Sequence, residues 1–104
     1  MKYLFVEADT NDADYVQSME KITEKQLVAF SPLLKAIKDF KSKKPYEHSW
    51  PDGEYCNGST QELYPDIDTE LIEEFKEFVP RGEHGVHSIE SIKVYEVSSV
   101  NELV

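Results

Sequence analysis

The sequence has little cysteine, little glycine and no long apolar run. The single cysteine, Cys56, cannot form a disulfide within the chain, which favours an intracellular setting. The four glycines, at 53, 58, 82 and 85, do not form a loop that could cradle a phosphate. The longest apolar runs, 3–6 and 27–30, have four residues each, whereas a membrane span needs about 20. We therefore expect no disulfide-stapled domain, no phosphate-binding loop and no membrane protein.

Basic residues are also scarce. The chain holds 11 Lys and Arg against 21 Asp and Glu, a net charge of −10. Residues 1–44 carry eight basic and seven acidic side chains, whereas residues 45–104 carry three basic and fourteen acidic ones. A protein that binds nucleic acid through its phosphates needs a basic surface. We therefore expect no direct contact with nucleic acid, and an acidic surface in the second half of the chain.

The apolar pattern predicts one α+β domain over residues 1–104. Strands are expected at 2–8, 15–22 and 86–97, and helices at 24–41 and 69–79. The order strand, strand, helix, long loop, helix, strand favours a small, mostly antiparallel three-stranded sheet with both helices packed on one face. The alternation of the last strand breaks at Glu90-Ser91, which predicts a bulge there.

Capping signals mark the start of each helix. Thr23 and Gln26 have the capping-box spacing, and Asp68 or Thr69 can cap the second helix. Pro32 lies inside the first helix, where it removes one hydrogen bond. We expect the helix to kink there; the alternative is that Ser31 caps a separate helix beginning at Pro32. The expected core consists of Leu4, Val6, Leu27, Phe30, Leu34, Ile37, Leu71, Phe75, Phe78, Ile92 and Val94.

The segment 43–65 has no sustained period but is rich in aromatic and His residues. Long loops of this kind are usually functional or contain short elements. Within it, Pro51-Asp52-Gly53 predicts a tight turn that would display Trp50 and Tyr55 on either side. One interpretation is that the aromatic side chains fasten the loop to the sheet. The other is a binding patch, because Trp and Tyr often anchor interfaces; this aromatic loop comprises Tyr46, His48, Trp50 and Tyr55.

No motif in the chain identifies an enzyme, a metal site or a cofactor site. His84 and His87 could share a zinc ion only if His48 or Cys56 came in from the loop. A pairing of Cys56 with His48 as nucleophile and base lacks any group that would lower the pKa of the thiol. The segment 9–14 resembles the start of a calcium loop but lacks the required glycine and the twelfth-position glutamate. We expect no catalytic residue, no metal and no cofactor.

The strongest functional signal is a run of carboxylates from residue 62 to residue 83. Only Lys76 and Arg81 interrupt it. Such a run is often a solvated helix face, but it can also steer and dock a basic partner. Inhibitors that imitate nucleic acid have this composition. We call these eight residues the acidic face: Glu62, Asp66, Asp68, Glu70, Glu73, Glu74, Glu77 and Glu83.

The layout also resembles a group of known proteins. An acidic hairpin, a Thr-capped helix with an internal proline, a Trp-containing loop and a closing Ile-Lys-Val-Tyr-Glu-Val strand resemble small uncharacterised acidic proteins of bacteriophages and mobile elements. The resemblance implies a phage or host-defence setting, in the cytoplasm of a bacterial cell or phage host. It implies no activity and no functional residues.

These observations predict a non-enzymatic binding protein that engages a basic protein surface, including one that normally holds nucleic acid. The alternative is a small-ligand or metal-binding domain built around the aromatic and His residues of the loop. We expect a monomer or a weak homodimer. The first helix has a basic end that comprises Lys35, Lys38, Lys41, Lys43 and Lys44. For Lys43 and Lys44 we predict no local partner. In a dimer this basic end would contact the acidic face of the other copy.

Overall fold

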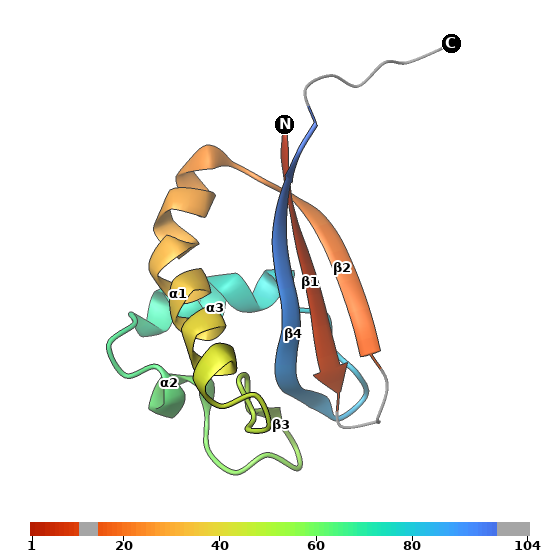
Figure 1. Ribbon diagram of the computed structural model, residues 1–104, viewed down its shortest axis with the longest axis vertical. Helices are drawn as coiled ribbons and strands as arrows, with labels where there is room; N and C mark the ends of the chain where they lie inside the picture. Colours follow the sequence, from red (N-terminus) through yellow and green to blue (C-terminus); the bar gives the residue numbers. More distant parts are fainter. Residues whose placement is uncertain (11–14, 98–104) are drawn as a thin grey trace.

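The chain forms an antiparallel sheet with its described helices on one side (Figure 1). The computed structural model describes residues 1–10 and 15–97. The elements are β1 (Lys2–Thr10), β2 (Tyr15–Ile22), α1 (Glu24–Lys43), β3 (Asp52–Gly53), α2 (Thr60–Leu63), α3 (Thr69–Phe75), the 3-10 helix η1 (Lys76–Phe78) and β4 (Gly85–Glu96). The α+β class and the antiparallel sheet are confirmed. The sheet has four strands, however, and not the three that were expected.

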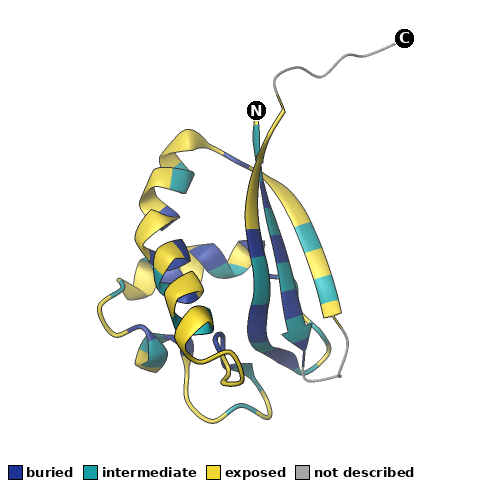
Figure 2. Cartoon of the chain, viewed as in Figure 1, coloured by how far each residue is buried: buried dark blue, intermediate teal, exposed yellow. Residues whose placement is uncertain are grey.

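The sheet is organised around β1. The strand order is β2-β1-β4-β3, so β1 pairs with β2 on one side and with β4 on the other. Leu4, Val6 and Ala8 alternate along β1 and are fully buried beneath the helices, while the residues between them are half-buried (Figure 2). This alternation is typical of a sheet with one packed face and one solvated face.

The hairpin pairs β1 with β2 from Lys2 opposite Ile22 to Asp9 opposite Tyr15. The bounds of β2 agree with the expected strand, and β1 extends two residues further than expected. The calcium-like segment 9–14 includes residues 11–14, which lie outside the described part of the chain.

Helix α1 begins at the predicted cap. The Thr23 hydroxyl accepts a hydrogen bond from the backbone N–H of Gln26, and the Gln26 side chain accepts one from the N–H of Thr23. The helix continues without interruption through Pro32, so the separate helix capped by Ser31 is not observed. Pro32 deprives the carbonyl of Val28 of its donor, but Val28 is 71% exposed. Water can therefore satisfy that carbonyl, which explains why the helix tolerates the proline.

The second predicted helix is shorter than expected and changes type. Helix α3 ends at Phe75 and tightens into η1, because Pro80 follows closely and cannot continue a helix. The side chain of Asp68 caps α3 by accepting from the N–H of Glu70 at 2.8 Å. The Ser18 hydroxyl of β2 donates to the carbonyl of Phe78 at 2.8 Å, which fastens η1 to the sheet.

The long loop contains two short elements and a core residue. Strand β3 has two residues and α2 has four, too short for any periodicity to predict them. Trp50 is 1% exposed, and its ring lies 5.5 Å from that of Phe75. The display of Trp50 beside a tight turn was therefore wrong: Trp50 fastens the loop to the core. Tyr55 is 64% exposed, as that turn predicted.

Strand β4 contains two register shifts against β1. One shift leaves Glu90 without a partner between Ser91 and Ile89, which confirms the predicted bulge, and the other leaves His87 unpaired. The strand begins at Gly85, whose φ of 108° suits glycine. A Cβ there would lie 2.3 Å from the carbonyl oxygen of Asp52. Gly85 therefore permits the close approach of β3.

The core contains most of the expected residues. Leu27 and Leu71 are only partly buried, and Val94 is 42% exposed because the helices do not cover the end of β4. Phe30 lies 5.3 Å from Phe75 and 5.5 Å from Phe78, both edge to face, the geometry that aromatic rings prefer. The core is thus an aromatic cluster between the sheet and the helices.

Tyr64 connects α2 to the loop. Its hydroxyl donates to the carbonyl of Ser49 at 2.6 Å, and Ser49 is fully buried. Burial raises the pKa of Tyr64 well above the ordinary tyrosine value. The folded protein therefore retains a phenolic proton that the unfolded chain releases in alkali.

This hydrogen bond leads to a first prediction. The substitution Tyr64→Phe leaves the buried Ser49 carbonyl unpaired, so the free energy of unfolding at neutral pH should fall by about 1–3 kcal/mol. The stability that Tyr64 provides should be lost as pH rises above about 10, where the unfolded chain ionises. The difference between wild type and variant in urea denaturation should therefore shrink above that pH. Tyr46→Phe is the control, because Tyr46 is 99% exposed; a constant difference at all pH values would contradict the prediction.

Candidate functional site

All eight residues of the acidic face are exposed in the structure. They lie along α2, α3, η1 and the segments that follow α2 and η1. The apolar side chains of α3, Ile72 and Phe75, point into the core, so the carboxylates of the helix face away from it. The sequence predicted this separation because the apolar and acidic residues alternate with helical spacing.

The densest part of the acidic face lies on α3 and η1. Glu70, Glu73, Glu74 and Glu77 follow one another at steps of three, one and three residues, and this spacing places them on adjacent turns. Glu70 and Glu74 are a like-charged pair four residues apart within α3, which destabilises an exposed helix by about 0.2–0.5 kcal/mol. Glu74 and Glu77 also lie near the negative end of the helix dipole. The positions of Glu74 and Glu77 therefore do not stabilise the helix.

Two cations lie near the acidic face, and one of them forms an ion pair with it. The ammonium of Lys76 lies 3.0 Å from a carboxylate oxygen of Glu73 and 3.7 Å from one of Asp52. The guanidinium of Arg81 also lies 3.7 Å from Asp52. Asp52 of β3 therefore shares both cations, and within residues 1–10 and 15–97 no ion pair involves Glu70, Glu74 or Glu77.

Other members of the acidic face have local structural roles. Asp68 caps α3, and Glu62 lies in the first turn of α2, where the helix dipole favours an acid. Asp66 and Glu83 are exposed in the connections after α2 and η1. Asp52 was missed as a neighbour of this surface, since only the tertiary fold brings β3 beside Lys76.

The basic end of α1 is largely paired within the molecule. Lys41 lies 2.9 Å from Glu90, Lys43 lies 3.1 Å from Asp39, and Lys44 lies 3.7 Å from Glu47. The expectation that Lys43 and Lys44 lack local partners was therefore wrong. These internal pairs weaken the argument for a dimer that joins this end of α1 to the acidic face.

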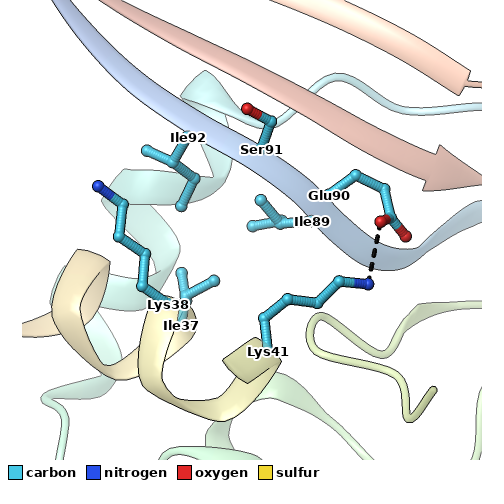
Figure 3. A pocket seen from close by; sticks show the side chains of 7 residues that line it. All are labelled: Ile37, Lys38, Lys41, Ile89, Glu90, Ser91 and Ile92. Atoms are coloured by element: carbon cyan, nitrogen blue, oxygen red, sulfur yellow. Dashed lines mark ion pairs between the residues drawn. The ribbon is translucent and has the colours of Figure 1, made fainter. Parts of the chain in front are cut away.

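A hollow lies beside the same end of α1. Figure 3 shows Ile37 and Ile89 between the helix and β4, with Lys38 on one side and the Lys41–Glu90 ion pair on the other. The hollow has a volume of about 120 Å³. Sites for small molecules usually measure about 300–1,000 Å³. This hollow is smaller than such sites, and no residue of the aromatic loop lines it.

The His and aromatic residues of the second hypothesis form two separate pairs near the start of β4. His48 and His87 stack with ring centroids 4.5 Å apart, and Nδ1 of His84 lies 2.8 Å from Glu54. The ring of Tyr55 packs edge-on against His84 at 5.2 Å. No group of three or more metal-ligating side chains was found among the described residues.

Cys56 and Tyr46 complete the set of candidate residues in the loop. The thiol of Cys56 lies 3.6 Å from the carbonyl oxygen of Val86. Tyr46 is 99% exposed. The aromatic loop therefore consists of one core residue, Trp50, and three side chains on the surface.

The geometry thus leaves the acidic face as the principal candidate. No helix in the described residues is both long and apolar enough to cross a membrane. The chain matches no family model, no curated protein and no solved structure.

The like charges on α3 lead to a second prediction. Glu74→Gln removes the repulsion with Glu70 and a negative charge at the unfavourable end of the helix, so the free energy of unfolding should rise by about 0.2–0.5 kcal/mol. Glu70→Gln is the matched control. It relieves the same repulsion but loses the favourable interaction with the helix N-terminus, and its net effect should be smaller. Urea denaturation at low salt measures both; a loss of stability in Glu74→Gln would contradict the prediction.

Proposed function

We propose that the protein is a non-enzymatic binding protein whose acidic face engages a basic surface of another protein. The observation that carries the proposal is the exposed stripe of glutamates on α3 and η1, in which Glu73 pairs with Lys76 while Glu70, Glu74 and Glu77 have no ion pair with any described residue. A surface that only needed to be soluble would not require like charges on adjacent turns of one helix. A basic partner would relieve their mutual repulsion.

The physics of such a surface favours rapid recognition. A concentrated negative field attracts a basic partner over distances longer than contact and orients it before docking. Proteins that bind nucleic acid have basic surfaces of this kind. The proposal therefore includes partners whose basic site normally holds nucleic acid, with the carboxylates of the acidic face in the place of phosphates.

The proposed setting is the cytoplasm of a bacterial cell or phage host. It rests on the lone Cys56 and on the layout that resembles acidic proteins of phages and mobile elements. In that setting a small acidic protein would encounter the nucleic-acid-binding proteins of its host.

A third prediction tests the acidic face directly. A variant in which Glu70, Glu73, Glu74 and Glu77 are all changed to Gln should bind a fluorescent polyarginine peptide at least about tenfold more weakly than wild type, because attraction by the clustered charges is lost. Fluorescence anisotropy measures the affinity. Raising the salt concentration should weaken wild-type binding strongly and variant binding only slightly, because exposed charges are screened.

The matched control removes four charges outside the acidic face. Glu20→Gln, Asp39→Asn, Glu47→Gln and Glu96→Gln change exposed residues and alter the net charge by the same amount. If this control weakens binding as much as the first variant, affinity follows net charge and the acidic face is not a site. A second assay asks whether the wild type displaces duplex DNA from a basic DNA-binding protein and whether the first variant fails to do so.

A further inference from the structure

The side of the sheet turned away from the helices is a second surface with its own chemistry. Residues that are directly opposite in an antiparallel pair point to the same side of a sheet. From Leu4 to Thr10 the even-numbered residues of β1 are buried, so its odd-numbered residues and their partners occupy the other side. Ser88, the partner of Asp9 on β4, is buried. We call the remaining set the open sheet face: Tyr3, Phe5, Glu7, Asp9, Tyr15, Gln17, Met19, Lys21, Ser91, Lys93 and Tyr95.

The open sheet face is more apolar than the solvated face of an antiparallel sheet usually is. Tyr15 is 64% exposed, Met19 is 55% exposed and Tyr95 is 42% exposed. The ring of Phe5 lies at the centre, 6.4 Å from that of Tyr95 and directly opposite Met19. The solvated side of an antiparallel sheet is normally polar. A continuous group of large apolar side chains on it indicates a surface that becomes covered.

Its charges are balanced and sorted along the strands. Lys21 lies opposite Tyr3 and Lys93 lies opposite Phe5, so both cations are at one end. Glu7 and Asp9 lie further along β1, at the other end. The four charges cancel on this face, whereas the whole chain carries −10. Lys21, Lys93 and Asp9 form no ion pair with any residue that the structure describes.

We propose that two copies of the chain associate through their open sheet faces, with their strands running antiparallel across the interface. A two-fold axis perpendicular to the strands places the lysines of one copy opposite Glu7 and Asp9 of the other, and the symmetry repeats the contact. The midpoint of the two lysines lies roughly 13 Å from the midpoint of the two acids, four residues along a strand, whereas Lys93 and Glu7 are only about 7 Å apart along it.

The opposite orientation is unfavourable. An axis parallel to the strands would place Lys21 and Lys93 against the same lysines of the other copy, and like charges in an interface are strongly disfavoured. Phe5 and Met19 lie close to the axis in the favoured arrangement, whereas Tyr95 lies level with Lys21 towards one end. The charges thus select one orientation and the apolar side chains supply the contact.

The proposed dimer is small and weak. The face is roughly 20 Å long and 14 Å wide, from the rise along a strand and the spacing of three strands. The buried area is therefore at or below the low end of stable interfaces, about 1,200 Å² in total. We expect dissociation constants of tens to hundreds of micromolar. The proposal is independent of the proposed function, because the acidic face lies on the helices and the connections beside them, not on the open sheet face.

Sedimentation velocity on the full chain tests the proposal with two charge-reversed variants. The pair Lys21→Glu and Lys93→Glu makes the open sheet face entirely acidic, and the pair Glu7→Lys and Asp9→Lys makes it entirely basic. Each variant alone should associate at least about tenfold more weakly than wild type, because every charge then faces its like. An equimolar mixture of the two should form a heterodimer at least as tight as the wild-type dimer.

Controls separate the face from net charge and from misfolding. Lys35→Glu with Lys38→Glu changes the net charge as the first variant does, but lies on α1 and should leave wild-type association unchanged apart from general repulsion. Circular dichroism verifies the fold of each variant. A wild type that stays monomeric at millimolar concentration overturns the proposal. So does a mixture that fails to associate, or a dimer that persists in either charge-reversed variant alone.

Discussion

Phe75 is the residue on which the arrangement of the helices depends. Its fully buried ring contacts Phe30 of α1 and Trp50 of the loop, and lies 6.5 Å from the ring of Phe78. Helix α3 has seven residues, too few to be stable alone in water. It persists because Phe75 and Ile72 are packed in the core. Because the apolar face of α3 packs against the core, the glutamates on its other face are exposed to solvent.

The same packing explains why Trp50 belongs to the core and is not displayed on the loop. Trp50 is buried against Phe75, and the hydroxyl of Tyr64 donates a hydrogen bond to the backbone carbonyl of Ser49 in the loop. Of the three side chains that remain outside, His48 and Tyr55 pack against His87 and His84, and Tyr46 is fully exposed. Aromatic content in a loop can therefore indicate a contribution to the core as readily as a contribution to an interface.

Local signals in the sequence predicted local structure well. The cap at Thr23, the cap at Asp68 and the strand 15–22 depend on neighbouring residues, and the structure has all three. The strand β3 could not be predicted, because it exists only through its pairing with β4. The carboxylates of the acidic face were also readable as exposed, from helical spacing alone. The attraction of Lys76 and Arg81 to Asp52 was not, since it joins residues far apart in the chain.

The two register shifts of β4 change what its sequence pattern means. Val86, Ile89 and Ile92 are buried at intervals of three residues, a spacing that would otherwise suit a helix, yet they oppose Thr10, Ala8 and Val6 at intervals of two. Between Val86 and Ile92, β4 therefore has three residues along the length that β1 spans with two. The two residues without a partner on β1 contact neighbouring elements instead. His87 stacks on His48 of the loop, and Glu90 forms an ion pair with Lys41 of α1. A deletion at either position would remove a bulge and leave the remaining pairs with β1 in place, so the core residues would stay buried while the neighbouring element lost its contact.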